Sequence, residues 1–191
     1  MRFDEYHIAP EIKLSLQELD YKKPTDIQFK AIPSILKGED VLAIAQTGTG
    51  KTAAFGIPVI HLLNKRKQGR RPDGIRCIVL APTHELAQQI TEVFDQLAKF
   101  TEVETLCLTG GVDQDPQIKR LKAGVDILVA TPGRLFDLYS QGHIRLERVE
   151  VLVLDEADHM LGLGFLQDID DLVRALPKQR QTLFFSATID A

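Results

Sequence analysis

The fold of this 191-residue chain is decided by the stretch Ala45-Gln46-Thr47-Gly48-Thr49-Gly50-Lys51-Thr52. It follows the apolar run 41–44 and precedes a helix-forming stretch, so the sequence predicts a strand, a glycine-rich turn and a helix N-terminus in succession. Glycines allow several backbone N–H groups to point at one anion, and the helix dipole adds partial positive charge behind them. This order of elements predicts a phosphate-binding loop.

Two side chains at the end of this stretch carry its chemistry. Lys51 would bring a full positive charge to the β and γ phosphates of a nucleotide, and the Thr52 hydroxyl would be a ligand for Mg²⁺. The usual pattern of such loops opens with glycine where this chain has Ala45. A plain Gly/Thr-rich turn is the alternative, but such a turn has no use for a lysine and a threonine at the helix start.

Composition restricts the function classes. The length suits one domain, and the hydrophobic content of 44% and charged content of 26% are ordinary for a globular protein. The net charge of −4 argues against wrapping of nucleic acid by bulk electrostatics, so any such contact must be local. There is no apolar run of membrane-spanning length and no signal-peptide core at the N-terminus, so we expect no membrane partner and a cytoplasmic location.

From residue 40 the chain alternates short apolar runs with helix-length segments. The runs lie at 41–45, 77–80, 105–108, 127–130, 151–154 and 183–185. Because their hydrophobicity is continuous, we expect an α/β domain in which strands buried on both faces form a mostly parallel central sheet with helices on both faces. Residues 1–36 are expected to form a helical preamble packed on a core domain of residues 37–191. A basic cluster over 65–71 is expected to be a solvated loop.

A polar motif follows each apolar run. After the phosphate loop come Ala81-Pro82-Thr83-His84, Thr109-Gly110-Gly111, Thr131-Pro132-Gly133-Arg134, Asp155-Glu156-Ala157-Asp158 and Ser186-Ala187-Thr188. The carboxyl ends of parallel strands lie along one edge, where open α/β folds bind ligands, so we expect six motifs on one surface. Helix capping alone would explain Thr83, Thr131 and Pro132. It would not explain acids at the tip of a buried strand.

The acids after the run 151–154 predict the catalytic centre. Asp155 would hold Mg²⁺ through water, and Glu156 would orient and deprotonate the attacking water, with Lys51 beside them. An acid pair that complements a helix dipole is the alternative, and the presence of a phosphate loop argues against it. Ser186 and Thr188 are short hydroxyls that could hydrogen-bond the acids or the surroundings of the γ-phosphate.

With these acids read in order as Asp155-Glu156-Ala157-Asp158, the chain resembles the first RecA-like domain of a DEAD-box RNA helicase of superfamily 2. The resemblance covers nearly the whole chain, and the phosphate loop of that family also starts with alanine. It implies a RecA-like P-loop fold and the use of ATP or ADP with Mg²⁺. The implied phosphate-binding residues are Ala45, Gln46, Thr47, Gly48, Thr49, Gly50, Lys51 and Thr52.

The resemblance also assigns roles to residues near the N-terminus and the C-terminus. Tyr21, Pro24, Thr25 and Gln28 resemble the adenine-reading Q motif, in which Gln28 would bind the adenine edge, and Phe3 would be the upstream aromatic that stacks on the base. The motif that couples hydrolysis to strand separation is resembled by Ser186, Ala187 and Thr188, with Asp158 as their hydrogen-bond partner.

Three remaining motifs resemble the RNA-backbone elements of the family. They are Pro82, Thr83 and His84; Gly110 and Gly111; and Thr131, Pro132, Gly133 and Arg134. Helix N-termini and glycine N–H groups bind phosphates without reading sequence, and Arg134 would add a charge-assisted contact. RNA is therefore the implied partner, through sequence-independent contacts.

Three positions depart from the family pattern, and one of them, Gly162, where the family more often has a polar residue, is expected to have little consequence. His84 stands where the family usually has arginine, which removes a permanent charge near the RNA path and predicts weaker or pH-dependent RNA affinity. Asp20 stands where the Q motif usually has glycine, so the geometry of that turn is in question.

The resemblance further implies a second RecA-like domain beyond residue 191, which would supply an arginine finger and half of the RNA site. Such a finger is worth about 10³ to 10⁵ in turnover, so we expect this chain to bind nucleotide and barely hydrolyse it. We also expect the chain to be a monomer. A DNA-directed ATPase of the same superfamily is one alternative, against which Asp158 and Gln28 argue. An ATP-dependent clamp that holds RNA without unwinding it is another, and the sequence does not exclude it.

Overall fold

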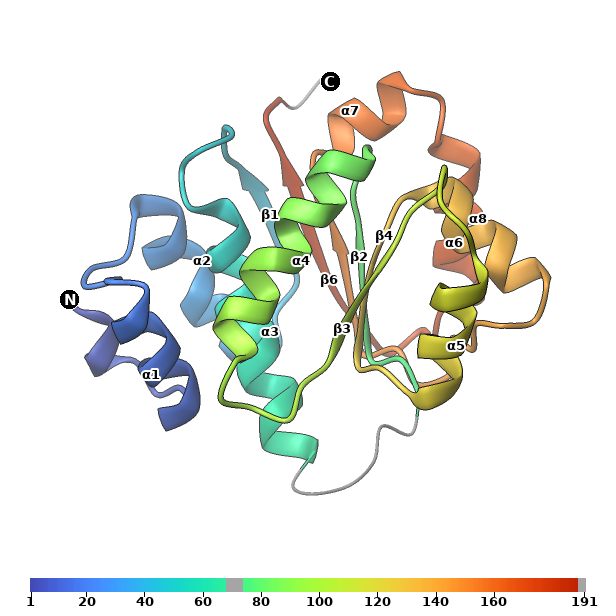
Figure 1. Cartoon of the computed structure of the whole chain (residues 1–191). Coiled ribbons are helices and arrows are strands. Elements are labelled where there is room, and N and C mark those ends of the chain that lie inside the picture. The colour runs from blue at the N-terminus through green and yellow to red at the C-terminus, as the bar shows by residue number, and fades with distance from the viewer. Residues whose placement is uncertain (68–73, 189–191) are drawn as a thin grey trace.

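A parallel sheet forms the centre of the molecule in the computed structural model, which describes residues 1–67 and 74–188 (Figure 1). Within these residues six strands pair in the order β1-β6-β5-β2-β4-β3, and every pair is parallel. The strands are Val41–Ile44 (β1), Cys77–Leu80 (β2), Thr105–Leu108 (β3), Ile127–Ala130 (β4), Val151–Leu154 (β5) and Gln181–Ser186 (β6). The predicted parallel α/β architecture is confirmed.

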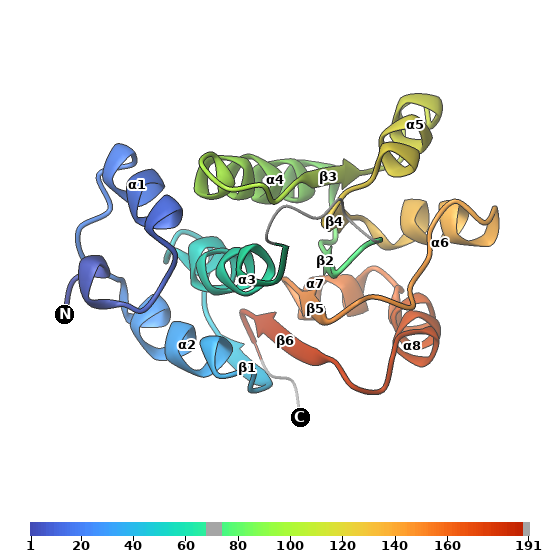
Figure 2. The same cartoon turned by 90° about the horizontal axis from the view of Figure 1, so that it is seen from below.

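Helices cover both sides of this sheet. In the described residues they are α1 (Pro10–Glu18), α2 (Asp26–Leu36), α3 (Lys51–Lys67), α4 (His84–Ala98), α5 (Asp115–Ala123), α6 (Pro132–Ser140), α7 (Ala157–Gly162) and α8 (Leu166–Ala175), after a 3-10 turn at Phe3–Glu5. Figure 2 shows α1 to α4 on one side and α5 to α8 on the other. In this part of the chain no helix has the length and apolar content to cross a membrane. Lys65, Arg66 and Lys67 of the basic cluster form the last turn of α3, so the expected loop is wrong for them, and residues 68–71 of the cluster lie outside the described residues.

Alternate residues of the central strands point to opposite helical layers, as the two-residue period of a strand requires. In β2, Cys77 and Val79 belong to the hydrophobic cluster under α3 and α4, whereas Ile78 and Leu80 belong to the cluster under α6, α7 and α8. All four side chains are fully buried. The continuous apolar runs of the sequence therefore correspond to strands with two buried faces.

The strand β1 is an exception to the predicted burial. Leu42 is 63% exposed and Ile44 is 57% exposed, although Ala43 between them is buried. Ala43 belongs to the cluster under α3, whereas Leu42 and Ile44 lie on the other face of this edge strand and belong to neither hydrophobic cluster. The expectation that every apolar run is buried on both faces is wrong for this strand.

The N-terminal residues pack on the helical layer beside α3. Ile12 of α1 and Ile32 of α2 are fully buried in the same cluster as Phe55 of α3. The backbone N–H of Ala9 donates a 2.9 Å hydrogen bond to Nδ1 of His61 on α3, and burial lowers the pKa of that histidine, so the neutral acceptor form is favoured. This contact fixes the start of α1 against α3.

Candidate active site at the carboxyl edge of the sheet

The polar motifs meet at the carboxyl ends of the strands, along the edge nearest the C-terminus in Figure 1. The phosphate loop joins β1 to α3, and the Asp155-Glu156 pair joins β5 to α7. Because β6 lies between β1 and β5, the residues 186–188 at its end lie between these two motifs. The other three motifs follow β2, β4 and β3, which form the other half of the sheet.

The phosphate loop is held open by glycine conformations and local hydrogen bonds. Gly48 and Gly50 have φ values of 83° and 79°, in the left-handed region that favours glycine. A side chain at Gly50 would also bring its Cβ to 2.5 Å from Nε2 of Gln28. The Thr49 hydroxyl donates a 2.7 Å hydrogen bond to the carbonyl of Gln46, which closes the turn. The loop therefore reaches the N-terminus of α3 with its backbone free to face an anion.

A buried ion pair links the phosphate loop to the acidic motif. Nζ of Lys51 lies 2.9 Å from Oδ1 of Asp155, and the two side chains are 6% and 0% exposed. Burial raises the pKa of Asp155, the Lys51 ammonium lowers it, and the charge of Glu156 raises it again, with an upward net shift. The sequence prediction that these two residues lie together is confirmed in geometry, and their catalytic roles remain predictions.

The donor atoms beside this pair fit a magnesium ion. Oδ2 of Asp155 is buried and has no hydrogen-bond partner among the described residues, while Thr52 lies half-buried in the first turn of α3. In the described part of the chain no three His, Cys, Asp or Glu side chains are grouped to hold a metal by themselves. Magnesium commonly binds one or two protein oxygens and completes its shell with phosphates and water, so this small donor set suits it.

Glu156 occupies a strained backbone position. Its φ and ψ values of 51° and 50° lie in the left-handed region, which costs a residue with a side chain about 1–2 kcal/mol. Its N–H donates a 3.0 Å hydrogen bond to Oδ1 of Asp155, and its carboxylate lies 3.7 Å from Nδ1 of His159. Strain of this kind is concentrated at active sites, and here it directs two successive acids from one strand end.

Gln28 joins α2 to the phosphate loop. Its side chain is 3% exposed; Nε2 donates to the carbonyl of Gly50 at 3.0 Å, and Oε1 accepts the N–H of Thr25 at 3.0 Å. Both ends of the amide therefore already contact protein, although each retains one further hydrogen or lone pair for a base. Adenine reading by Gln28 stays a prediction, and support of the loop is an additional role that the sequence did not reveal.

The predicted stacking of Phe3 on a base does not agree with the structure. Phe3 is 2% exposed, and its ring packs against Tyr6 and Tyr21 with centroid distances of 5.9 and 6.3 Å. No face of this ring is free for a base, because the apolar preamble buries it. Tyr21, which is 39% exposed, is the accessible aromatic residue of this group.

The turn at Asp20 keeps the geometry that glycine would give. Asp20 has a φ of 55°, and aspartate is one of the residues that most readily adopt this conformation. The N–H of Tyr21 then bonds to the carbonyl of Leu16 at 2.8 Å, which closes the end of α1. The turn before the Q motif therefore forms with aspartate in place of glycine.

A cleft of about 530 Å³ lies between the start of α2 and the phosphate loop. It is lined by Thr25, Asp26, Ile27, Lys30, Ile44, Ala45, Gln46, Gly48 and Thr49. Its size suits a small-molecule ligand. The sequence reasoning missed Asp26, Lys30 and Ile44. Helical spacing was the available signal for Lys30, because it follows Asp26 by four residues and so lies on the same face of α2.

Pro24, a predicted residue of the Q motif, does not line this cleft and is half-buried just before α2.

Asp158 connects the acidic motif with the end of β6. Its Oδ2 accepts hydrogen bonds from the Thr188 hydroxyl at 2.9 Å and the Thr188 N–H at 3.2 Å, and the Ser186 hydroxyl donates to the carbonyl of Thr188 at 2.6 Å. Burial raises the pKa of Asp158, but hydrogen bonds from Thr188, His159 and Ser186 outweigh it and the pKa is lowered. The predicted partner of the Ser186-Ala187-Thr188 motif is thus in contact with it, while the coupling role remains a prediction.

The three predicted RNA-backbone motifs lie at helix starts or turns on the other half of the edge. Thr83 caps α4 by accepting the N–H of Leu86 at 3.2 Å, and Thr131 precedes α6. Pro82 and Pro132 are buried and brace these starts, whereas Gly110, Gly111 and Gly133 are exposed. Exposed backbone of this kind can bind phosphates without reading bases, which keeps the RNA assignment physically reasonable.

A hydrogen-bond network ties these three motifs together, and its central residue, Gln117, was not predicted from the sequence. Nδ1 of His84 lies 2.6 Å from the Thr109 hydroxyl, and Nε2 of Gln117 donates to the Thr109 carbonyl at 3.3 Å. Arg134 donates to Oε1 of Gln117 at 2.8 Å and to the carbonyl of Val112 at 3.0 Å. Arg134 therefore braces the Gly110-Gly111 turn, rather than standing free for RNA as predicted.

A parallel α/β sheet whose carboxyl edge joins a phosphate loop to an Asp-Glu strand end defines the class of P-loop nucleotide-binding domains. Comparison with known proteins narrows this class. The family model described as DEAD/DEAH box helicase matches residues 25–191. The chain therefore belongs to the DEAD/DEAH box helicase family.

Individual relatives agree with this assignment. The chain is 42% identical to the ATP-dependent RNA helicase CshA of Listeria monocytogenes over 98% of its own length and 35% of that protein. It is 44% identical to the ATP-dependent RNA helicase RhlB of Pseudomonas syringae over 98% of its length and 48% of that protein. The crystal structure of a DEAD box protein from Methanococcus jannaschii matches all of this chain and 51% of its own, with 38% identity and a TM-score of 0.90. The chain thus spans about a third to a half of these proteins.

Proposed function

We propose that this chain is the ATP-binding domain of an ATP-dependent RNA helicase or RNA chaperone. The observation that carries the proposal is the buried Lys51–Asp155 pair between the phosphate loop and the acidic strand end, with one Asp155 oxygen lacking a partner. Buried ion pairs contribute little stability by themselves, so their presence favours a functional role. CshA and RhlB are both named ATP-dependent RNA helicases, which supports the choice of nucleotide and partner.

ATP would bind with its phosphates in the loop and at the N-terminus of α3. The backbone N–H groups around Gly48 and Gly50 would bind the phosphate oxygens, and Lys51 would be shared between the phosphates and Asp155. The purine would occupy the cleft beside Ile27 and Ile44, in reach of Thr25. ADP would bind in the same way, without contacts to a γ-phosphate.

Hydrolysis would depend on the acids at the end of β5. Thr52 and Asp155 would hold Mg²⁺, which when bound neutralises charge on the phosphates. Glu156 would orient the attacking water and accept its proton, because the left-handed turn directs it from the same strand end as Asp155. The bonds between Asp158 and Thr188 would carry the change in this site to the end of β6.

RNA would bind across the other half of the edge by its backbone. The starts of α4 and α6 and the turn at Gly110-Gly111 offer N–H groups to successive phosphates. A second RecA-like domain of the same protein would close over both ligands and supply an arginine finger, and the greater length of the relatives supports this. ATP would drive closure only through its higher affinity for the closed state.

We place the protein in the cytoplasm. Cys77 and Cys107 are both free thiols, which suits a reducing compartment.

The test is ATP hydrolysis and duplex displacement by the full-length protein that carries this domain. We expect hydrolysis to be stimulated by RNA and not by DNA, and expect Glu156→Gln to abolish turnover while ATP binding persists. Equal stimulation by DNA would favour a DNA-directed ATPase. RNA-stimulated hydrolysis without displacement of short duplexes would indicate a clamp instead of a helicase.

A further inference from the structure

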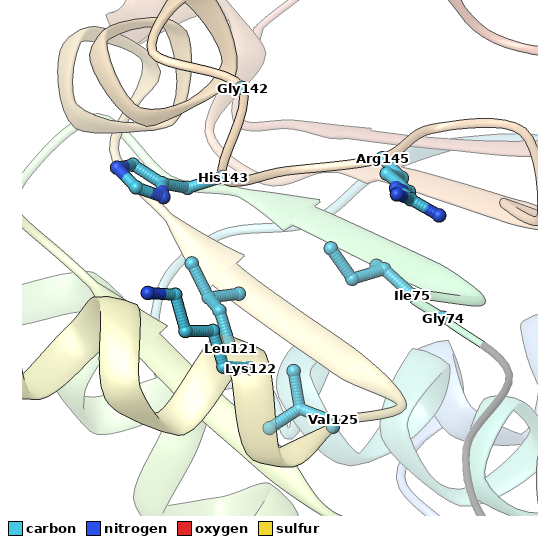
Figure 3. Close-up of a pocket in the computed structure, with 9 residues that line it drawn as sticks. Gly74, Ile75, Leu121, Lys122, Val125, Gly142, His143 and Arg145 are labelled. Carbon is cyan, nitrogen blue, oxygen red and sulfur yellow. The ribbon is translucent and has the colours of Figure 1, made fainter.

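A second cleft lies at the opposite edge of the sheet, away from the candidate active site (Figure 3). It has a volume of about 390 Å³ and is lined by Gly74, Ile75, Leu121, Lys122, Gly124, Val125, Gly142, His143 and Arg145. Gly74-Ile75 and Gly124-Val125 lie one residue before the starts of β2 and β4. Because all strands are parallel, the starts of β2 and β4 lie at the edge opposite the phosphate loop, and a ligand here would not compete with ATP.

The polar side chains of this cleft are all basic. Lys122, His143 and Arg145 line it, and no carboxylate of the described residues does so. Within residues 1–67 and 74–188, none of these three side chains forms a hydrogen bond or an ion pair. By contrast, Arg76 and Arg66 nearby are both paired with Glu150. In a chain of net charge −4, three unpaired basic side chains around one hollow indicate an anion site.

The arrangement of these groups restricts the shape of the anion. Figure 3 shows His143 and Lys122 on one side of the cleft and Arg145 on the other, with Ile75 between them. Ile75 and Val125 are buried and form an apolar floor with Leu121. Two positively charged regions separated by an apolar floor match a ligand with two anionic ends and a carbon skeleton between them.

We propose that this cleft binds a small organic bisphosphate, of the size of a sugar bisphosphate. One phosphate would be bound by Lys122 and His143, the other by Arg145, and the carbon skeleton would lie on Ile75, Leu121 and Val125. The volume of about 390 Å³ is within the range of small-molecule sites.

The experiment is calorimetric titration of the chain with fructose 1,6-bisphosphate as the probe, in the presence of saturating Mg·ADP to occupy the phosphate loop. We expect one binding site, with weaker binding of fructose 6-phosphate and none of fructose. The double variant Lys122→Ala/Arg145→Ala should lose at least about tenfold in affinity, because each removes a charge-assisted contact. NMR resonances of the His143 ring should move during the titration of the wild type.

The control variant is Lys37→Ala/Lys178→Ala, which removes the same charge from exposed lysines outside the cleft. It should keep the affinity of the wild type within about twofold. An equal loss in both double variants, no heat with the bisphosphate, or binding that disappears when ADP is present would each overturn the proposal. ADP affinity measured in the same samples reports separately on the candidate active site, so the two proposals fail independently.

Discussion

We call the half of the carboxyl edge at β1, β6 and β5 the nucleotide half and the half at β2, β4 and β3 the RNA half, after the ligands proposed for them, and the two halves differ in where their charges lie. In the nucleotide half, Lys51 and Asp155 are almost completely buried and contact each other at 2.9 Å. In the RNA half, Gly110 and Gly111 are exposed, and Arg134 is bound to protein groups that fix their turn. The first half presents buried side-chain charge, and the second presents exposed backbone held in place by side chains.

This difference corresponds to the two ligands proposed. A terminal phosphate chain with its metal needs concentrated charge in a site of low dielectric, where each interaction is strong. An RNA backbone of any sequence needs evenly spaced, weak contacts, which exposed N–H groups provide. Substitutions in the first half should therefore change stability and nucleotide affinity strongly, and those in the second half should change RNA affinity moderately.

The largest effect on stability is expected for Lys51→Ala, because it leaves the buried Asp155 carboxylate without its partner. We expect the free energy of unfolding to fall by about 3 kcal/mol at pH 7, measured by urea denaturation. Lys51→Met/Asp155→Leu, which removes both charges, should recover most of this loss. A loss below about 0.5 kcal/mol in the single variant would contradict the contrast between the halves.

The pH dependence of that loss follows from the raised pKa of Asp155. The pKa of Asp155 in the folded state lies above its ordinary value of 3.8. The ionised carboxylate therefore lowers the free energy of unfolding as the pH rises above 3.8. Without Lys51 the pKa rises further, and the destabilisation should be smaller at pH 5 than at pH 8. The same denaturation series at the two pH values measures it, and an opposite trend would reject the assignment.

A smaller effect, on RNA affinity, is expected from Gln117→Ala. This variant distinguishes a structural role of Arg134 from its direct contact with RNA. Gln117 is 9% exposed and holds Arg134 and the Thr109 carbonyl, so its loss should weaken RNA binding about as much as Arg134→Ala does. We expect three- to tenfold, or about 1 kcal/mol, for each variant, by fluorescence anisotropy with single-stranded RNA at low salt. If Arg134→Ala alone weakens binding, Arg134 contacts RNA directly.

His84→Arg should strengthen RNA binding by a few-fold. It replaces the Nδ1 contact with Thr109 by a permanent charge at the start of α4, and one more neutralised phosphate would steepen the salt dependence by about 0.7 in the slope of log affinity against log salt. His84→Gln, which adds no charge, is the matched control. Equal salt slopes for all three proteins would place His84 outside the RNA path.

The smallest effect, on thermal stability, is expected for Asp158→Asn, because Asp158 lies near the surface and its hydrogen bonds are screened by solvent. Its pKa is lowered, so its carboxylate stabilises the folded state above about pH 4, and this contribution is lost as the pH falls through the lowered pKa. The thermal midpoint of the wild type should exceed that of the variant at pH 6 and approach it at pH 3. A constant difference between those pH values would argue against the bond.

The strands and their polar ends were predictable because each is encoded locally. An apolar run followed by a motif such as Asp155-Glu156 needs no knowledge of the rest of the fold. Burial on both faces failed at β1, since Leu42 and Ile44 lie on a face of this edge strand that belongs to neither hydrophobic cluster. The burial of Phe3 and the Arg134–Gln117 bond were not predictable either, because both depend on partners brought together only by tertiary packing.

The central claim is that the stretch from Ala45 to Thr52 binds the phosphates of a nucleotide, and ADP affinity tests it most directly. Calorimetry with Mg·ADP should compare the wild type with Lys51→Ala, under conditions where circular dichroism reports both as folded, and with Lys37→Ala as an exposed control. We predict that Lys51→Ala weakens binding at least about tenfold while the control matches the wild type. An unchanged ADP affinity in Lys51→Ala would contradict the assignment of the phosphate loop.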